Sequence, residues 1–173
     1  MRPIHALPLI AALALAACNN DDDEALTDED LAGSTIQDNG AMPQPGEYAT
    51  TVELIDFVDP DLDQATMARA RSEFEIGAAE PSLYCVTEET TREVWLSDMT
   101  EATCTLSRFT ADGNSLDGAM TCSSDIGLNG PLEMTGTAGG QSADLRMSYT
   151  MPEDAGAGTV TMRVLSERIG DCS

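Results

Sequence analysis

Four widely spaced cysteines are the first residues of this sequence whose type suggests chemistry. They are Cys85, Cys104, Cys122 and Cys172. No two have the Cys-x-x-Cys spacing of a redox or zinc site, and the only histidine, His5, lies near the N-terminus. The fifth cysteine, Cys18, belongs to the N-terminal export signal described below. The other four are even in number, which in an exported chain indicates two disulfides with three possible pairings. These cysteines therefore predict structural cross-links and no metal site.

Residues suited to nucleophilic catalysis are scarce. After residue 17 the sequence has no histidine and no lysine, so it offers neither a base beside a nucleophile nor a Schiff-base amine. Gly139-Gly140 precedes a strand pattern instead of a helix and does not form a phosphate loop. Paired carboxylates are able to hydrolyse glycosides, but no pair stands out among 31 acidic residues. The sequence predicts a protein that is not an enzyme and uses no cofactor.

Two patterns resemble metal sites more closely. Asp59, Asp61 and Asp63 have the spacing that opens a calcium-binding hand, but Gln64 replaces its glycine and Ala70 its final glutamate. A helix start is the favoured interpretation. Methionines on predicted strands would suit Cu(I). Their favoured role is packing in a core that is poor in aromatic residues. A pliable apolar pocket is a third interpretation, between these two. These methionines are Met120, Met134, Met147, Met151 and Met162.

The N-terminus predicts export and lipid attachment. Arg2 precedes an uncharged, mostly apolar run over residues 6–17, which is too short to span a bilayer. The run ends in Leu15-Ala16-Ala17-Cys18, which resembles the bacterial lipobox. We therefore expect residues 1–17 to be a signal peptide and Cys18 to carry the acyl chains that anchor the protein to a bacterial membrane. A plain secretory signal is the alternative. The expected location is the cell envelope, with the domain in the periplasm.

The charge of the mature chain excludes one class of partner. Residues 18–173 hold 31 acidic residues against seven arginines, a formal charge of −24. Such a surface repels the phosphates of nucleic acids. It also repels anionic lipid headgroups, so membrane attachment has to rest on the acyl chains at Cys18.

Residues 18–44 are expected to form the lipidated cysteine and a disordered acidic tether. Seven of the ten residues 21–30 are acidic, and Gly, Ser, Asn, Pro and Gln follow. This composition buries too little apolar surface to offset the entropy of ordering. A flexible segment of this length reaches roughly 25–30 Å. A solvated spacer is favoured over calcium binding.

Residues 45–173 predict a single β domain. Tyr48 and Val52 alternate with polar residues, and the apolar positions then switch to Ile55 and Phe57, which indicates a bulge. A helix is expected from Asp59 to about Gly77, with its apolar stripe at Met67, Ala70 and Phe74. A second, short helix is capped by Thr87 and turns Val94 and Trp95 inward. The remaining strands are expected at 82–87, 103–109, 115–123, 132–138, 143–151 and 159–169.

Short turn clusters separate the last five of these strands, which favours an antiparallel meander. Residues 143–151 alternate strictly between apolar and polar types, so one face of the sheet is expected to meet water. The predicted fold is mainly β, an antiparallel coiled meander sheet or partial barrel with one or two short helices packed on it.

Four short motifs in this order resemble a family of exported, often lipid-anchored proteobacterial proteins known only as a domain of unknown function. They are Pro45-Gly46-Glu47-Tyr48, Cys85-Val86-Thr87-Glu88, Met120-Thr121-Cys122 and Ile169-Gly170-Asp171-Cys172. Val86 and Glu88 replace the leucine and proline usual in the second motif. The resemblance covers about residues 45–173 and implies the domain limits and the four-cysteine framework. It implies no activity, cofactor or catalytic residue.

The disulfide pairing is predicted from one turn. Asp112-Gly113-Asn114 lies midway between Cys104 and Cys122, so a hairpin centred there places the two cysteines opposite each other. Cys85 and Cys172 then remain to pair with each other.

The function predicted from the sequence is a non-catalytic binding or structural module of the cell envelope. A carrier of an apolar or lipid-like ligand is the first alternative, since a curved sheet can enclose such a molecule. A carboxylate-based hydrolase is the second. The expected partners are the membrane, through Cys18, and a protein or an apolar ligand.

Overall fold

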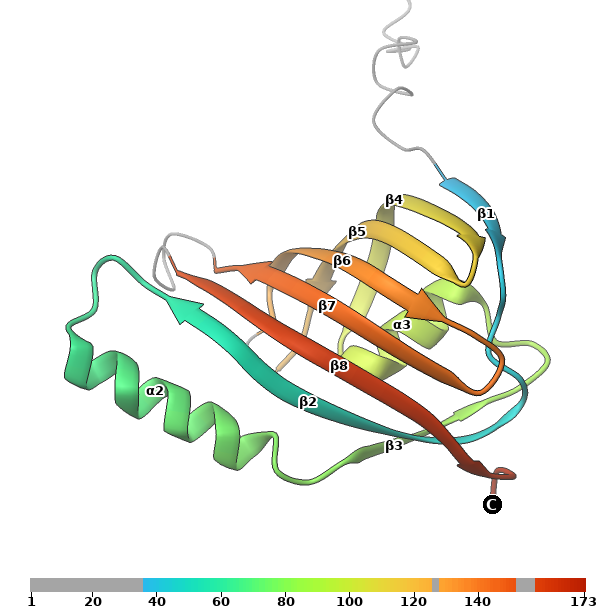
Figure 1. Cartoon of the computed structure of the whole chain (residues 1–173), viewed down its shortest axis with the longest axis horizontal. Coiled ribbons are helices and arrows are strands. Elements are labelled where there is room, and N and C mark those ends of the chain that lie inside the picture. The colour runs from blue at the N-terminus through green and yellow to red at the C-terminus, as the bar shows by residue number, and fades with distance from the viewer. Residues whose placement is uncertain (1–35, 126–127, 152–157) are drawn as a thin grey trace, which may run out of the picture.

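A curled half-barrel of eight strands forms the domain (Figure 1). The structure is a computed structural model that describes residues 36–125, 128–151 and 158–173; the predicted signal peptide, Cys18 and tether residues 19–35 lie outside this range. The sheet order is β1-β4-β5-β6-β7-β8-β2-β3. The strands are β1 (Ile36–Gly40), β2 (Gly46–Val58), β3 (Ser82–Val86), β4 (Thr103–Gly113), β5 (Ser115–Ser123), β6 (Gly130–Ala138), β7 (Ser142–Thr150) and β8 (Thr159–Gly170).

The mainly β prediction is confirmed, with one correction to the topology. Strands β4 to β8 form the expected antiparallel meander, but β1 pairs with β4 in parallel, so the sheet is mixed. Residues 36–40 form a strand although the sequence predicts a disordered tether there, because the segment 18–44 buries too little apolar surface to offset the entropy of ordering. A contact with Arg92, described below, holds them in the sheet instead.

The bulge predicted in β2 is present. The register with β8 shifts between Leu54 and Asp56, so Leu54 and Phe57 both point to the concave side, while Ile55 is 40% exposed. Strand β7 alternates as predicted: Ala143, Leu145, Met147 and Tyr149 are buried. The opposite, convex face carries exposed ion pairs, among them Arg163 with Asp144 at 2.6 Å. One face of the sheet therefore meets water.

Helix α2 (Gln64–Gly77) begins later than expected. Its N-cap is Asp63, whose carboxylate accepts a hydrogen bond from the Thr66 N–H, which lowers the pKa of Asp63. Asp59 instead accepts from the Asp61 N–H in the preceding turn. Among the described residues, no three Asp, Glu, His or Cys side chains are grouped to hold a metal ion.

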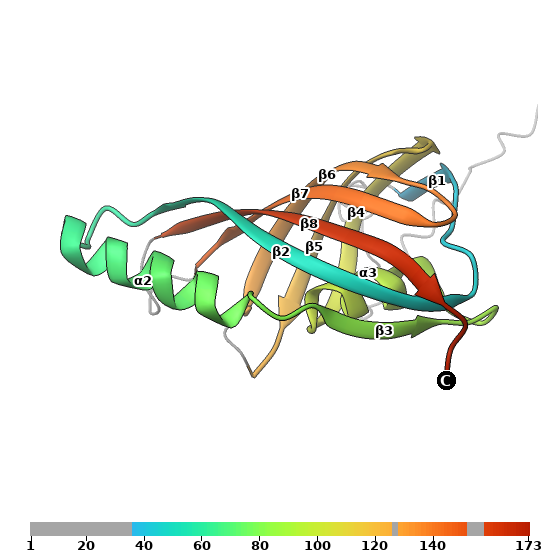
Figure 2. The ribbon, with the colours of Figure 1, turned by 60° about the horizontal axis from the view of Figure 1, so that its bottom comes forward.

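Helix α2 packs on the sheet, as predicted, but it does not close the core. None of its residues is buried, and Met67, Ala70 and Phe74 are only half-buried. The helix runs beside the outer half of β2 (Figures 1 and 2). The Arg71 guanidinium donates at 2.7 Å to both the Asp56 carboxylate and the Phe57 carbonyl. Its amphipathic stripe therefore meets the edge of the sheet and not its concave face.

Helix α3 (Arg92–Thr100) fills one part of the concave face (Figure 2). Its N-cap is Thr91 and not the predicted Thr87, which forms a separate turn with Thr90. The inward face also differs from the prediction: Trp95 is 1% exposed, whereas Val94 is 48% exposed. No helix of the described residues is long and apolar enough to cross a membrane.

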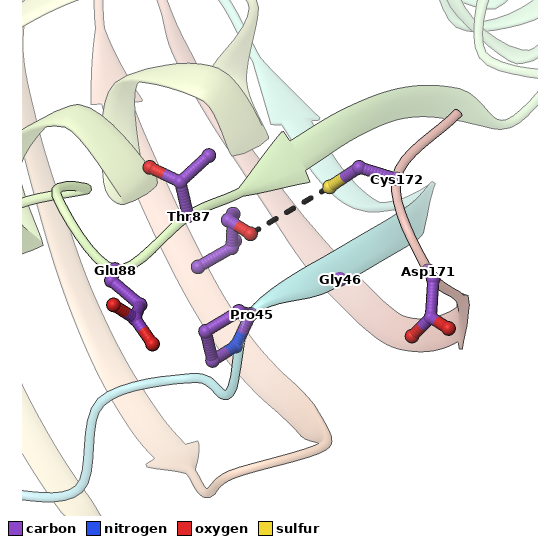
Figure 3. A pocket seen from close by; sticks show the side chains of 7 residues that line it. Pro45, Gly46, Thr87, Glu88, Asp171 and Cys172 are labelled. Carbon is purple, nitrogen blue, oxygen red and sulfur yellow. Dashed lines mark hydrogen bonds between the residues drawn. The ribbon is translucent and has the colours of Figure 1, made fainter.

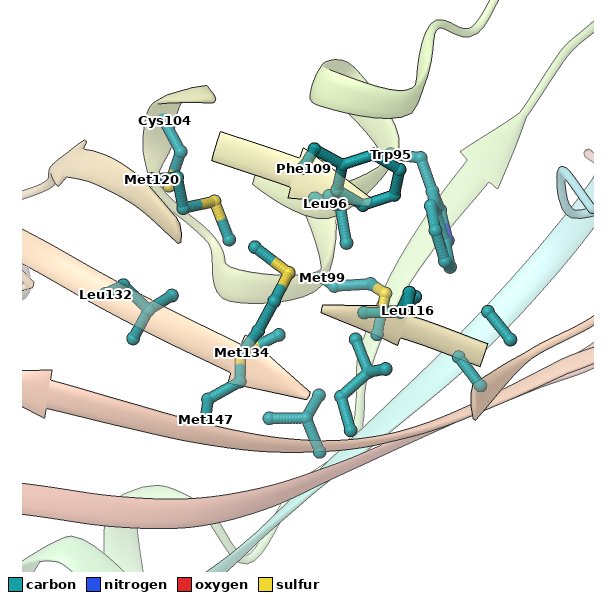
Figure 4. Packing of buried hydrophobic residues seen from close by; sticks show 14 of the residues in the cluster. Trp95, Leu96, Met99, Cys104, Phe109, Leu116, Met120, Leu132, Met134 and Met147 are labelled. Atoms are coloured by element: carbon teal, nitrogen blue, oxygen red, sulfur yellow. The ribbon is translucent and has the colours of Figure 1, made fainter. Parts of the chain in front are cut away.

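The core lies between α3 and the sheet (Figure 4). Trp95, Leu96 and Met99 of α3 contact a cluster that includes Phe109 and Leu132. Met120, Met134 and Met147 lie in the same cluster, each at most 1% exposed. These three methionines serve as core packing, the favoured interpretation of the sequence. Met151 and Met162 lie at the margin of the core and are only partly buried.

Candidate functional site

Both disulfides form in the predicted pairing. Cys104 and Cys122 face each other across the β4–β5 hairpin with their Cα atoms 4.0 Å apart. Cys85 of β3 bonds Cys172 just beyond the end of β8, with Cα atoms 5.7 Å apart. The second bond ties the last residues of the domain to an edge strand.

Three of the four sequence motifs meet at one surface hollow of about 290 Å³ (Figure 3). Its lining comes from Pro45-Gly46, from Val86-Thr87-Glu88 and from Asp171-Cys172. The fourth motif lies apart from it, because Met120 and Cys122 belong to the core.

Close contacts in this hollow show that it fastens the chain end. Arg168 donates to the Pro45 carbonyl at 3.0 Å and to the Asp171 carboxylate at 2.6 Å. Gly46 has φ +152°, and a Cβ atom there would lie 2.3 Å from Arg168 Nε, so only glycine fits. The carboxylates of Glu88 and Asp171 line the hollow, but both are exposed to solvent, and Asp171 is paired with Arg168. We call these contacts of Arg168 with Pro45 and Asp171 the clasp, because they hold the C-terminal segment against β2. The hollow offers no desolvated acid for hydrolysis.

A buried guanidinium holds β1 in place. The Arg92 side chain is 7% exposed and donates to both carboxylate oxygens of Asp38, at 2.9 and 2.7 Å. It also donates to the carbonyls of Gly40 and Ala41 at 3.1 and 2.9 Å. The rings of Trp95 and Phe109 lie 5.8 and 5.1 Å from its central carbon. No local sequence pattern indicates this contact, since 54 residues separate Arg92 from Asp38.

Beyond α3, the concave side of the sheet keeps apolar residues that α2 and α3 leave partly exposed. We call this surface the open apolar face; it consists of Val52, Leu54, Met151, Val160 and Met162. Leu54 pairs with Met162, and Met162 pairs on its other side with the buried Met147. The face is thus continuous with the core. Of the five strand methionines, Met151 and Met162 lie on this margin of the sheet.

A hydroxyl cluster borders the open apolar face below α3. The Tyr84 hydroxyl accepts from Trp95 Nε1 at 3.1 Å and shares a hydrogen bond of 2.7 Å with Ser166 Oγ. Burial raises the pKa of Tyr84. Thr50 pairs with Ser166 across β2 and β8, and its buried Oγ1 lies near the Tyr84 hydroxyl but makes no hydrogen bond of normal geometry within the described residues.

Asp98 is the acidic residue beside this cluster. It follows Trp95 by three residues, so both side chains lie on one side of α3. It is partly buried, and its carboxylate has no hydrogen-bond or ion-pair partner among the described residues. Burial raises the pKa of Asp98, and its negative charge also raises the pKa of Tyr84. The sequence did not single out Asp98, although its spacing from the inward-facing Trp95 was a usable signal.

Comparison with known proteins gives one match. A family described as a protein of unknown function, DUF3617, matches residues 43–172. No curated protein and no solved structure matches the chain. The match spans both disulfides, the clasp, the open apolar face and Asp98, and it begins just after β1. Because it covers most of the sequence, the chain belongs to the DUF3617 family, whose function is unknown.

Proposed function

We propose that this protein is a non-catalytic binding module of the bacterial cell envelope, anchored to a membrane by acyl chains on Cys18, with its domain in the periplasm. The observation that carries the binding role is the open apolar face. Single exposed apolar residues are normal on any protein, whereas a continuous patch is typical of an interaction site. Here five apolar residues from β2, β8 and the end of β7 adjoin one another and are only partly buried.

The shape of this surface supports binding over carriage of an enclosed ligand. Carriers surround most of the surface of a small ligand. Two hollows of the described residues lie at strand ends and turns: the one of about 290 Å³ at Pro45-Gly46, and one of about 300 Å³ lined by residues that include Asn114, Asp144 and Glu167. No residue of the open apolar face lines either of them. A carboxylate-based hydrolase at the hollow beside Pro45 has weaker support still, because its acids Glu88 and Asp171 are exposed.

An apolar reporter dye tests the binding role. We expect the mature domain to bind Nile red, a neutral dye that the charge of −24 does not repel, with a blue shift and increased emission. Met162→Gln should weaken the affinity by about fivefold, which corresponds to about 1 kcal/mol. Leu165→Gln, on the opposite face of β8, is the matched control and should leave the affinity unchanged. Near-ultraviolet circular dichroism checks that both variants stay folded. Absence of dye binding, or equal losses in both variants, contradicts the proposal.

Mass spectrometry of the protein from its bacterial host tests the anchor. We expect the mature N-terminus to be Cys18 carrying acyl chains, because the lipobox cysteine is modified before the signal is removed. Cys18→Ala should shift the protein from the membrane fraction to the soluble fraction. An unmodified chain that begins at another residue would rule out the lipid anchor.

A further inference from the structure

We propose that the open apolar face binds a protein segment in which an arginine or lysine lies next to apolar side chains, and that this cation pairs with Asp98. The inference rests on the proposed function and names the chemistry of its partner.

The first step is the position of Asp98 relative to the face. Trp95 of α3 contacts Tyr84, and the hydroxyl of Tyr84 reaches Ser166 on β8. Ser166 lies two residues beyond Val164, which pairs with Val52 of the open apolar face. Asp98 lies one helical turn beyond Trp95 and close enough to Tyr84 to influence its hydroxyl. Asp98 therefore lies on the side of α3 that faces Tyr84, next to the hydroxyl cluster that adjoins the open apolar face.

The second step is that Asp98 lacks a partner. Five arginines form ion pairs with other carboxylates, and none of these pairs includes Asp98. A partly buried carboxylate without a hydrogen bond or a counter-charge costs free energy in the unbound protein. A cation that arrives with an apolar partner removes this cost, because the partner also excludes water from the pair.

The third step is the choice of a protein segment. The open apolar face is an extended surface and not an enclosed cavity. Surfaces of this kind bind the apolar side of an amphipathic protein segment. The charge of −24 on the mature chain attracts a basic partner and repels anionic lipid headgroups. Apolar side chains with an adjacent cation match both the face and Asp98.

The binding test uses the mature domain and two synthetic helical peptides. One consists of leucine and lysine, and the other has glutamine in place of each lysine. Fluorescence anisotropy should show that Asp98→Asn weakens binding of the lysine peptide by about tenfold, and leaves binding of the glutamine peptide unchanged. Glu133→Gln removes the same charge from the exposed convex face and should change neither affinity by more than about twofold. If Asp98→Asn and Glu133→Gln weaken binding of the lysine peptide equally, net charge alone explains the attraction, and the proposed pairing of the cation with Asp98 is overturned.

A stability measurement separates a binding role from a structural one. Because the pKa of Asp98 is raised in the folded protein, its contribution to stability is present at low pH and is lost as the pH rises through that pKa. Asp98→Asn should therefore stabilise the free domain at neutral pH against urea while it weakens peptide binding. A loss of stability in Asp98→Asn would make Asp98 a structural residue and overturn the proposal.

The remaining outcomes distinguish this inference from the proposed function. If Nile red binds in a Met162-dependent manner but Asp98→Asn leaves the lysine peptide unaffected, the binding role stands and the pairing fails. If phosphatidylcholine vesicles bind in a Met162-dependent manner and neither peptide does, the partner is a lipid surface and the proposal is overturned.

Discussion

Replacement of Cys85 and Cys172 by alanine is expected to lower the free energy of unfolding of the domain by about 4.5 kcal/mol. The disulfide joins residues 87 positions apart, so its loss releases a large loop in the unfolded chain. Both cysteines are exposed, so alanine removes little packing. In the folded state the bond also fixes β3, a five-residue edge strand that pairs with β2 alone.

Urea unfolding of the oxidised double variant, compared with the native protein, measures this effect. The Cys104–Cys122 bond spans only 18 positions and is worth about 3 kcal/mol by the same reasoning. Because Cys104 and Cys122 are buried, their replacement adds a loss of packing and gives a less direct measure of the cross-link. If the free energy of unfolding of the Cys85 and Cys172 double variant falls by less than about 2 kcal/mol, strand pairing alone is sufficient to hold the C-terminal segment.

Arg92→Met is expected to detach β1 and to lower the free energy of unfolding by about 2–3 kcal/mol. Methionine keeps an apolar side chain against Trp95 and Phe109 but loses four hydrogen bonds to residues 38–41. Asp38 is already 34% exposed, so its carboxylate can return to water when the strand leaves. For this reason the cost stays below that of breaking a fully buried ion pair.

Hydrogen exchange resolves the local part of this prediction. The amides of β1 should exchange much faster in Arg92→Met, while those at the centre of β2 remain protected. Arg163→Met is the matched control, because its ion pair with Asp144 is exposed on the convex face and distant in the sheet order from β1. Protection of β1 in the Arg92→Met variant would show that its backbone pairing with β4 is sufficient.

The features that could be predicted from the sequence depend on local signals. The alternation of β7, the bulge after Leu54 and the turn between Cys104 and Cys122 each follow from residues close in the chain. The helix starts were harder, because Thr87 and Thr91 both offer a capping hydroxyl and only packing of the inner face decides between them. β1 escaped prediction because its polar residues bury little and depend on a distant guanidinium.

The candidate site was predicted only in part. The sequence identified Met151 and Met162 as apolar strand residues but did not show which strand residues the helices leave partly exposed. The stripe at Met67 and Phe74 predicted an amphipathic helix, but it did not show where that helix would pack, because periodicity identifies a face and not the surface that it contacts. Asp98 is one of 31 acidic residues, and only the fold shows that it lacks a partner.

The two edges of the half-barrel affect whether copies of this protein aggregate at high concentration. An incompletely closed sheet has two edge strands, and naked edges promote intermolecular pairing and aggregation. Here one edge is β1, a short strand whose Asp38 and Asn39 disfavour pairing. The other edge is β3, together with the half of β2 beyond residue 50, where a bulge, Glu53, Asp56 and the adjacent α2 interrupt a regular ladder. We therefore expect the domain to stay soluble at high concentration as long as both edges remain protected.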